Sequence, residues 1–207
     1  PNSRDRYYLM KYDVATGLSE RLTYGSHNVY LNDISPDGKK LLCSTSKPDI
    51  TQCPFSLSSL FEIDLATLQA DTLVAWDAYL GSASYSPDGK QLLVTGSPSA
   101  FGGIGKNCGE HPIANDFDTQ AFIMDLATKK VQAITRDFNP TVSPVQWNRV
   151  DGCIYFDTTD GDCRHIYRYV PKTGGFEMLP REEDVITSFT LANDNPVVAA
   201  YVGGGNT

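Results

Sequence analysis

Histidine and cysteine are the residue types in this chain best suited to bind a metal or to attack a substrate. The three histidines, His27, His111 and His165, are so widely spaced that only the fold could gather them around a metal ion. The cysteines form no Cys-x-x-Cys pair and no spacing typical of zinc ligands; they are Cys43, Cys53, Cys108, Cys153 and Cys163. We therefore predict no metal site and no cofactor.

Other motifs with known chemistry are incomplete. Asp157, Asp160 and Asp162 surround Gly161, but their spacing differs from the calcium-binding EF-hand loop and is typical of turn aspartates. Residues 103–109 differ by one residue from the glycine-rich dinucleotide fingerprint and do not open a helix. A Gly-x-Ser-x-Gly nucleophile motif is missing from the 207 residues, so we assign no catalytic residue here.

The composition excludes several classes of function. With 41% hydrophobic and 20% charged residues the chain is globular, and a formal net charge of -8 without a basic patch disfavours nucleic acid as a partner. No apolar stretch is long enough for a membrane-spanning helix. The chain begins at Pro1 without a signal-peptide pattern, so we expect a piece cut from a longer protein.

A repeated turn motif shows how the chain is organised. Ser-Pro-Asp-Gly at residues 35–38 recurs at residues 86–89, and degenerate copies begin at Asn148 and Ala192. Proline at the second position, aspartate at the third and glycine at the fourth favour the tight reversal of a hairpin. The motif therefore predicts antiparallel strands on either side of it.

A second marker alternates with the first in a fixed order. Its form is Asp-x-Ala-Thr-Gly, in which the aspartate accepts backbone N–H groups and the glycine supplies a positive φ. It occurs at residues 13–17, 64–68, 125–129 and, more loosely, 170–174. Leu68 and Lys129 replace the glycine, so either these turns differ in type or they carry about 1 kcal/mol of strain.

Short runs rich in β-branched and aromatic residues lie between the turns and are predicted to be strands. Four runs make each unit: residues 29–34, 41–45, 60–63 and 70–74; then 79–85, 91–95, 121–124 and 131–134; then 142–147, 154–158, 165–170 and 176–179. Two more strands are expected at each end, at residues 6–13, 18–23, 186–191 and 197–202. Helical periodicity is absent throughout.

Repeated units of four antiparallel strands predict an all-β fold, a partial β-propeller with an arc of about four blades. A β-sandwich is the alternative, but it does not explain two turn markers in constant phase. The half blades either close a four-bladed ring or, as we favour, belong to the arc of a larger one. We expect one domain, with half blades at residues 1–27 and 181–207 and blades at residues 28–75, 76–136 and 137–180.

These motifs resemble the propeller of the prolyl oligopeptidase and dipeptidyl peptidase IV-like serine peptidases. The resemblance rests on Ser-Pro-Asp-Gly-Lys before an apolar strand, on the Asp-Leu-Ala-Thr turn, and on residues 97–126 and 137–140, which resemble bacterial members. TolB-like propellers share the repeat motifs. The resemblance implies a hydrolase as the parent chain, in which a separate α/β-hydrolase domain carries the catalytic residues and the propeller gates access of a peptide substrate. It also implies a location outside the cytoplasm, such as the periplasm.

Two long loops depart from the repeat and form the candidate binding surface. Residues 47–58 and 97–118 stand where the third unit has a turn of about five residues, 158–162. Both loops are expected on one propeller face, where loops carry binding surfaces on a rigid scaffold. Cys53 and Cys108 lie in these loops, where a disulfide bridge is conceivable. The acidic rim is expected to meet a peptide's amino group or the hydrolase domain; its residues are Glu110, His111, Asp116 and Asp118.

Two other functions stay open from the sequence. One is a stand-alone binding propeller of the TolB-like type, and the other is a propeller lyase with a histidine-bound metal. Glu182 and Glu183 invite comparison with the glutamate pair by which dipeptidyl peptidase IV-type propellers hold a substrate amine. Their neighbours Arg181 and Asp184 do not resemble that family's motif, so we give the pair no such role.

Overall fold

The computed structural model describes residues 5–108, 116–138, 140–160, 163–180, 185–195 and 198–203. Regular structure in these ranges is almost entirely β-strand, which confirms the all-β prediction. The first half contains β1 (Met10–Tyr12), β2 (Ser19–Arg21), β3 (Val29–Ile34), β4 (Lys40–Pro48), β5 (Ser56–Asp64), β6 (Ala70–Asp77), β7 (Leu80–Tyr85) and β8 (Gln91–Gly96). The second half contains β9 (Gln120–Asp125), β10 (Val131–Ala133), β11 (Thr141–Trp147), β12 (Ile154–Asp160), β13 (Cys163–Val170), β14 (Gly175–Met178), β15 (Val185–Leu191) and β16 (Val198–Gly203).

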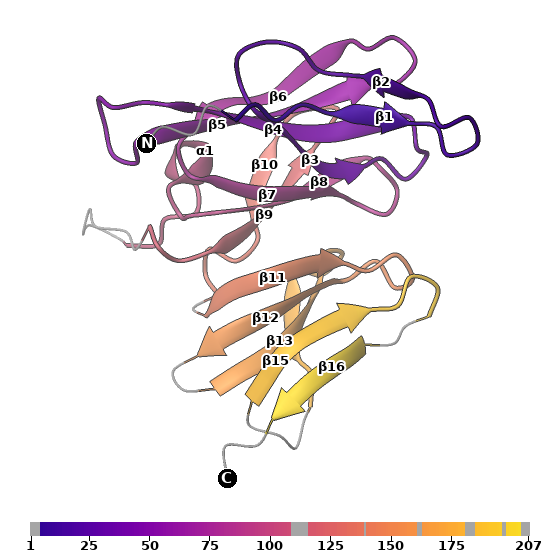
Figure 1. The fold of residues 1–207 in the computed structure, drawn as a ribbon. Helices are drawn as coiled ribbons and strands as arrows, with labels where there is room; N and C mark the ends of the chain where they lie inside the picture. Colours follow the sequence, from indigo (N-terminus) through magenta and orange to yellow (C-terminus); the bar gives the residue numbers. More distant parts are fainter. Residues whose placement is uncertain are drawn as a thin grey trace.

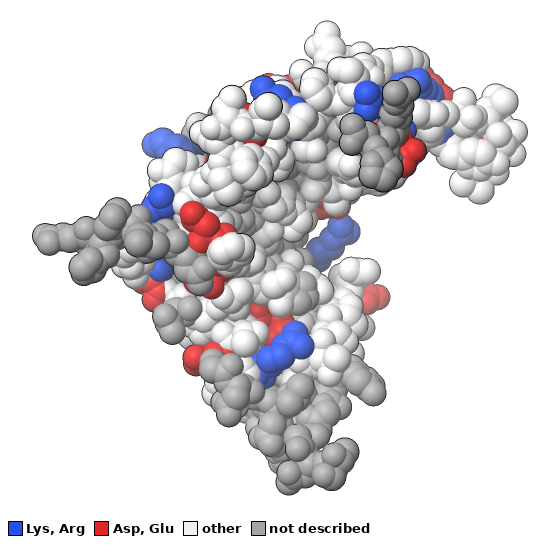
Figure 2. Space-filling view, turned by 60° about the vertical axis from the view of Figure 1, so that its left-hand side comes forward, with Lys and Arg blue, Asp and Glu red and all other residues white. Residues whose placement is uncertain are grey.

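Consecutive strands form antiparallel sheets that follow one another along an arc (Figure 1). Three sheets have four strands, in the orders β3-β4-β5-β6, β7-β8-β9-β10 and β11-β12-β13-β14. The remaining strands pair as β1-β2 at one end and β15-β16 at the other. The two end pairs do not join each other, so the arc is open, and a space-filling view shows the hollow between its two arms (Figure 2).

The Ser-Pro-Asp-Gly turns reverse the chain as predicted. In the first turn Gly38 N donates to Ser35 O at 2.8 Å, and Ser35 Oγ donates to Asp37 Oδ1 at 2.7 Å. The second turn repeats both bonds, and its glycine has the same φ of 70° as Gly38. Ser35 Oγ also accepts hydrogen bonds from Lys39 N and Lys40 N, so the side chain satisfies backbone groups that the reversal leaves unpaired.

The second marker forms the same turn whether or not it carries glycine. Gly17 N donates to Asp13 O at 2.9 Å, and Leu68 N and Lys129 N make the equivalent bonds at 2.8 Å. Gly17 has a φ of 73°, while Leu68 and Lys129 both have a φ of 56°. The turn type is therefore constant, and the two non-glycine residues carry the strain of a left-handed backbone.

Apolar side chains fill the spaces between neighbouring sheets. Because successive strand residues point to opposite faces, Leu42 packs toward the second full sheet while Leu41 and Cys43 pack toward Leu9 and Leu22 of the end pair. The same alternation places Leu92 and Val94 on one side of β8 and Leu93 on the other. Cys43 is fully buried, as predicted for a core residue, and burial raises the pKa of its thiol to about 12.

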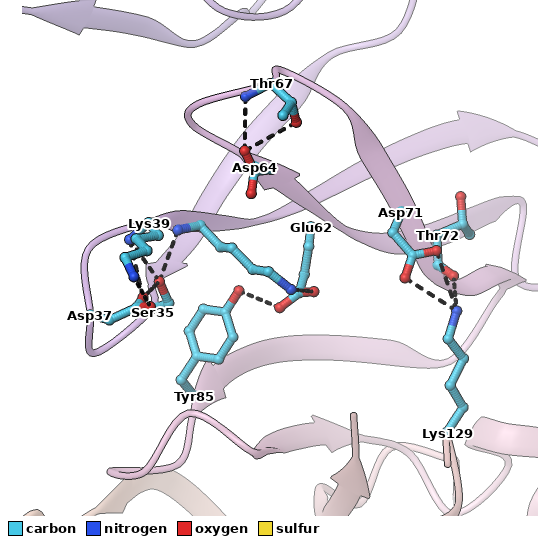
Figure 3. Close-up of polar contacts among 11 residues, drawn as sticks. Ser35, Asp37, Lys39, Glu62, Asp64, Thr67, Asp71, Thr72, Tyr85 and Lys129 are labelled. Atoms are coloured by element: carbon cyan, nitrogen blue, oxygen red, sulfur yellow. Dashed lines mark hydrogen bonds and ion pairs between the residues drawn. The ribbon is translucent and has the colours of Figure 1, made fainter. Parts of the chain in front are cut away.

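Polar contacts also join the first and second full sheets (Figure 3). The Glu62 carboxylate, whose residue is only 6% exposed, accepts a hydrogen bond from Tyr85 Oη at 2.7 Å and pairs with Lys40 Nζ at 2.8 Å. Lys129 Nζ reaches back from the second sheet to Thr72 O at 2.9 Å. The buried Tyr85–Glu62 hydrogen bond and the more exposed Lys129 contact therefore add to the apolar packing between these two sheets.

One short helix, α1 (Ala100–Gly103), interrupts the long loop between β8 and β9. The sequence did not predict it, because four residues are too few to show helical periodicity. Asp77 Oδ2 accepts a hydrogen bond from Phe101 N at 2.7 Å, which fixes the helical turn against β6. Within the described residues no helix has the length and apolar character needed to cross a bilayer.

Candidate functional site

The two long loops meet at a cavity of about 700 Å³. Cys53 and Pro54 come from the loop between β4 and β5, whereas Asp116, Phe117 and Asp118 come from the loop between β8 and β9. The strands and the β6–β7 connection complete the wall with Ala78, Tyr79, Leu80, Gly81, Thr95, Gly96, Ser97, Thr119 and Ser143. Both loops thus open on the same face of the arc, the face opposite the marker turns.

Glycine keeps the backbone around this cavity closely packed. A Cβ atom at Gly81 would lie 2.7 Å from Thr95 Oγ1, and one at Gly96 would lie 2.8 Å from Tyr79 O. Neither distance is compatible with a larger residue unless the strands shift. The wall formed by β7 and β8 is therefore defined by rigid strands, and the variable part of the site is its loop rim.

The cavity rim carries two carboxylates, those of Asp116 and Asp118. Asp116 Oδ1 accepts hydrogen bonds from Ser99 Oγ and, at 3.4 Å, from Ser97 Oγ, while Asp118 Oδ1 accepts one from Thr141 Oγ1 at 2.9 Å. Across the part of the chain that the structure describes, neither aspartate takes part in an ion pair. Hydroxyl groups therefore hold Oδ1 of each carboxylate in place.

The loop that carries these aspartates is anchored to the sheets at several points. The Phe101 ring packs on Phe122 of β9, with their centroids 5.2 Å apart. Gln120 Nε2 donates to Gly105 O at 3.0 Å, and Arg136 Nε donates to Lys106 O at 3.1 Å. These contacts fix the part of the loop before residue 109, so the cavity wall is built on a supported backbone.

Of the rim residues predicted from the sequence, the structure brings Asp116 and Asp118 to one cavity, and Glu110 and His111 lie outside the described residues. Sequence reasoning missed the apolar residues of the two loops, of which Phe117 lines the cavity. Phe117 is 98% exposed and Phe55 and Ile50 of the neighbouring loop are also exposed. Bulky apolar residues inside otherwise polar loops were the signal that could have identified them.

The interpretation of Asp157 as a turn aspartate is wrong. Asp157 lies within β12, is almost fully buried and pairs with Arg164 of β13. The strand continues to Asp160 and β13 begins at Cys163, so the connection is shorter than the five residues expected. Cross-strand pairing at Thr158 and beyond extends the hairpin past the point at which β-propensity falls.

Other candidates from the sequence do not converge. His27 lies near Trp76 and His165 lies in β13, while His111 and the pair Glu182–Glu183 fall outside the described ranges. Among the residues that are described, no group of three or more metal-binding side chains is found. Cys53 and Cys108, the two loop cysteines, are free thiols and form no disulfide with each other.

Comparisons with known proteins identify the architecture. No family model matches the chain, and no curated relative matches it. The solved structure of TolB from Acinetobacter baumannii is similar with a TM-score of 0.65 and 20% identity, over 97% of this chain and 44% of that one. The chain folds as an arc of a β-propeller.

Two further solved structures are similar at low sequence identity. An oligogalacturonate lyase in complex with manganese matches with a TM-score of 0.68 and 15% identity, over 91% of this chain and 51% of that one. An acylaminoacyl peptidase from Pyrococcus horikoshii matches with a TM-score of 0.55 and 14% identity, over 94% and 33%. The chain thus spans between a third and about half of these solved chains, and the likeness concerns the fold alone.

Proposed function

We propose that this chain is part of the non-catalytic propeller of a serine peptidase similar to prolyl oligopeptidases, and that its loop face binds peptide. The observation that carries the proposal is the cavity between the two long loops, with Asp116 and Asp118 on its rim. The α/β-hydrolase domain of the same parent protein would supply the nucleophile, since no nucleophile motif occurs in this sequence. Residues 1–207 would form one propeller segment in that protein.

The chemistry of the rim supports a peptide with a positively charged group. Asp116 and Asp118 accept hydroxyl hydrogen bonds through Oδ1, and an ammonium or guanidinium group donates well to carboxylate oxygens. The exposed ring of Phe117, which lines the same cavity, provides apolar contact beside them. The net charge of -8 further favours the approach of a cationic ligand.

A second candidate function is a stand-alone binding propeller of the TolB-like type. It is favoured by the match to a solved TolB, which covers 97% of this chain. In that case the same loop face would bind a protein partner, and no hydrolase domain would be attached. The two candidates share the binding face and differ in whether the protein contains a serine nucleophile.

Labelling the purified full-length protein with a fluorophosphonate reporter separates the two candidates. The peptidase function predicts covalent labelling of one serine, whereas the binding propeller predicts none. Peptide binding is tested by calorimetry with the acetylated amide Ac-Arg-Ala-NH₂. The double variant Asp116→Asn with Asp118→Asn should weaken binding about tenfold or more, because charge-assisted hydrogen bonds are lost. Asp194→Asn, an exposed aspartate in a marker turn on the opposite face, serves as the matched control.

A further inference from the structure

The last residue of the second marker differs between the second and the third full sheet. The marker ends with Lys129 in the second sheet and with Gly174 in the third. Both residues donate their backbone N–H to the first residue of their marker, at 2.8 and 2.9 Å, and both have a positive φ, of 56° and 71°. The two positions are therefore structurally equivalent, although only one of them carries a side chain.

At the junction of the first and second full sheets, the Lys129 side chain supplies a cation (Figure 3). Its ammonium group donates to Thr72 O at 2.9 Å and lies 3.4 Å from Asp71 Oδ1. Thr72 and Asp71 belong to β6, the edge strand of the first full sheet. The lysine thus reaches from one sheet to a carbonyl and a carboxylate of the sheet before it.

The next junction has a cavity at the equivalent place. It has a volume of about 300 Å³, lies between the second and third full sheets, and is lined in part by Gln132, Ala133 and Gly174. Gln132 and Ala133 stand three and four residues after the marker of their sheet, as Asp71 and Thr72 do in the sheet before. This junction cavity is therefore bounded by the equivalents of the residues that make the lysine contact, with glycine in place of the lysine.

The other residues around the junction cavity favour a cation on an alkyl chain. Gln132 is neutral where Asp71 is a carboxylate, but Asp137, from the connection between β10 and β11, also lines the cavity and supplies a carboxylate. The rings of Phe138 and Phe176 line it too, and aromatic rings attract cations and pack against alkyl groups. An anionic ligand would be repelled by Asp137.

We propose that the junction cavity binds a primary ammonium group on an alkyl chain, the group that a lysine side chain carries. The ligand would do at this junction what Lys129 does at the junction before it. The volume is at the lower end of those of ligand pockets, as expected for one side chain. The site shares no lining residue with the cavity between the long loops, so the proposal does not depend on peptide binding there.

Calorimetry with n-butylammonium chloride tests the site in the purified full-length protein. The double variant Asp116→Asn with Asp118→Asn serves as the background, so that a cation bound at the loop face does not contribute. Gly174→Lys should weaken binding about tenfold or more, since the protein's own ammonium group would occupy the cavity. Gly174→Ala is the control and should keep the affinity within about twofold, because a Cβ atom there would lie 4.0 Å from Tyr169 Oη, an ordinary contact.

The equivalence of the two junctions provides a reciprocal test. Adding Lys129→Gly to Gly174→Lys should restore binding, because it removes the lysine from the first junction and leaves Thr72 O and Asp71 to the ligand. Glycine suits the φ of 56° at this position, so the turn should still form. A combined variant that still fails to bind n-butylammonium would overturn the proposal.

Thermal unfolding separates the effect of the ammonium group from that of filling the cavity. Gly174→Lys should melt about 1–3 °C higher than Gly174→Met, because both variants place an unbranched chain in the cavity and only lysine adds a positive charge. Equal melting temperatures would show that the junction does not prefer a cation, and the proposal would then be wrong.

A second probe, Ac-Lys-NH₂, identifies the source of the ammonium group. Tighter binding of Ac-Lys-NH₂ than of n-butylammonium would support a lysine side chain of a peptide or protein, and the reverse order would support a free alkylamine. Failure of both probes to bind in the Asp116→Asn, Asp118→Asn background, or equal affinity after Gly174→Lys, would overturn the site. Failure of Ac-Arg-Ala-NH₂ alone to bind the wild-type protein would refute the loop-face function and leave this site standing.

Discussion

The buried carboxylate of Glu62 allows a sharp prediction about how neighbouring sheets are held together. Tyr85→Phe removes the hydroxyl group that donates to Glu62 Oε1 at 2.7 Å and leaves the aromatic ring in place, so no cavity forms. A hydrogen bond to a charged group contributes about 1.5–3 kcal/mol. Lys40 remains as the second partner of Glu62, and we therefore expect a loss of about 2 kcal/mol in the free energy of unfolding.

Urea unfolding provides the assay for this loss. The midpoint should fall in Tyr85→Phe while the slope stays constant, because the folded and unfolded states expose the same surface as before. Tyr155→Phe is a matched control: its hydroxyl donates to Asp151 at 2.6 Å, but Asp151 is exposed and lies in the turn between β11 and β12, so the bond joins no second sheet. A change in Tyr85→Phe below about 0.5 kcal/mol, or an equal loss in the control, would show that Glu62 does not join the sheets.

Further predictions concern strain and pH. Leu68→Gly should raise the free energy of unfolding by up to about 1 kcal/mol, and Gly17→Ala, at a φ of 73°, should lower it by a similar amount in urea titrations. Burial raises the pKa of the Cys43 thiol from 9.0 to about 12, so the thiol of the unfolded chain loses its proton at a lower pH than that of the folded chain. The free energy of unfolding should therefore decline as pH rises above 9.0, and Cys43→Ala should reduce this decline. A hydrogen bond from Ser86 lowers the pKa of Asp88, so the stabilisation that the Asp88 carboxylate gives the folded state is lost as pH falls below the ordinary value of 3.8. Asp88→Asn should therefore weaken the loss of stability at acidic pH, and an unchanged loss would contradict this interpretation.

The architecture was predictable because its turns have local chemistry. Glycine, proline and aspartate define the first marker at residues 35–38 and 86–89, and the structure shows the same hydrogen bonds in both copies. Apolar runs between the turns then specify strands whose two faces are both covered, such as β4 and β8. Local propensities and the repeat therefore agree, which is the condition for a reliable prediction.

The charged contacts between sheets could not be predicted. Glu62 stands two residues before the marker aspartate of its unit, where the next unit has Ile123. Nothing local distinguishes a glutamate that is exposed from one that is buried against Tyr85 of another sheet. The sequence spacing between the two residues carries no periodic signal, so only the packing of whole sheets reveals the pair.

The location of the candidate site could be predicted from the sequence, but only part of its chemistry could. The loops were recognised because they break the repeat, and this is also why Asp116 and Asp118 were selected. Phe117 was missed because the loop residues were selected by charge, and Phe117 is apolar. The positive φ of Trp76 could not be predicted either, because it results from a bulge in the pairing of β5 with β6 and not from the residue type.

The non-glycine residues with a positive φ are of two kinds: some lie in exposed turns, and others have side chains whose contacts offset the strain. Leu68 and Lys129 occupy turns where other copies have glycine, and they are exposed on the face opposite the cavity. Phe101, with a φ of 54°, lies beside the cavity, but its packing on Phe122 and its bond to Asp77 offset the strain. Trp76, with a φ of 49°, is likewise held by Lys47, whose Nζ lies 4.1 Å from the ring centre, and by the ring of His27. Phe101→Gly should therefore destabilise the loop that carries the two carboxylates, because it removes the ring that packs on Phe122.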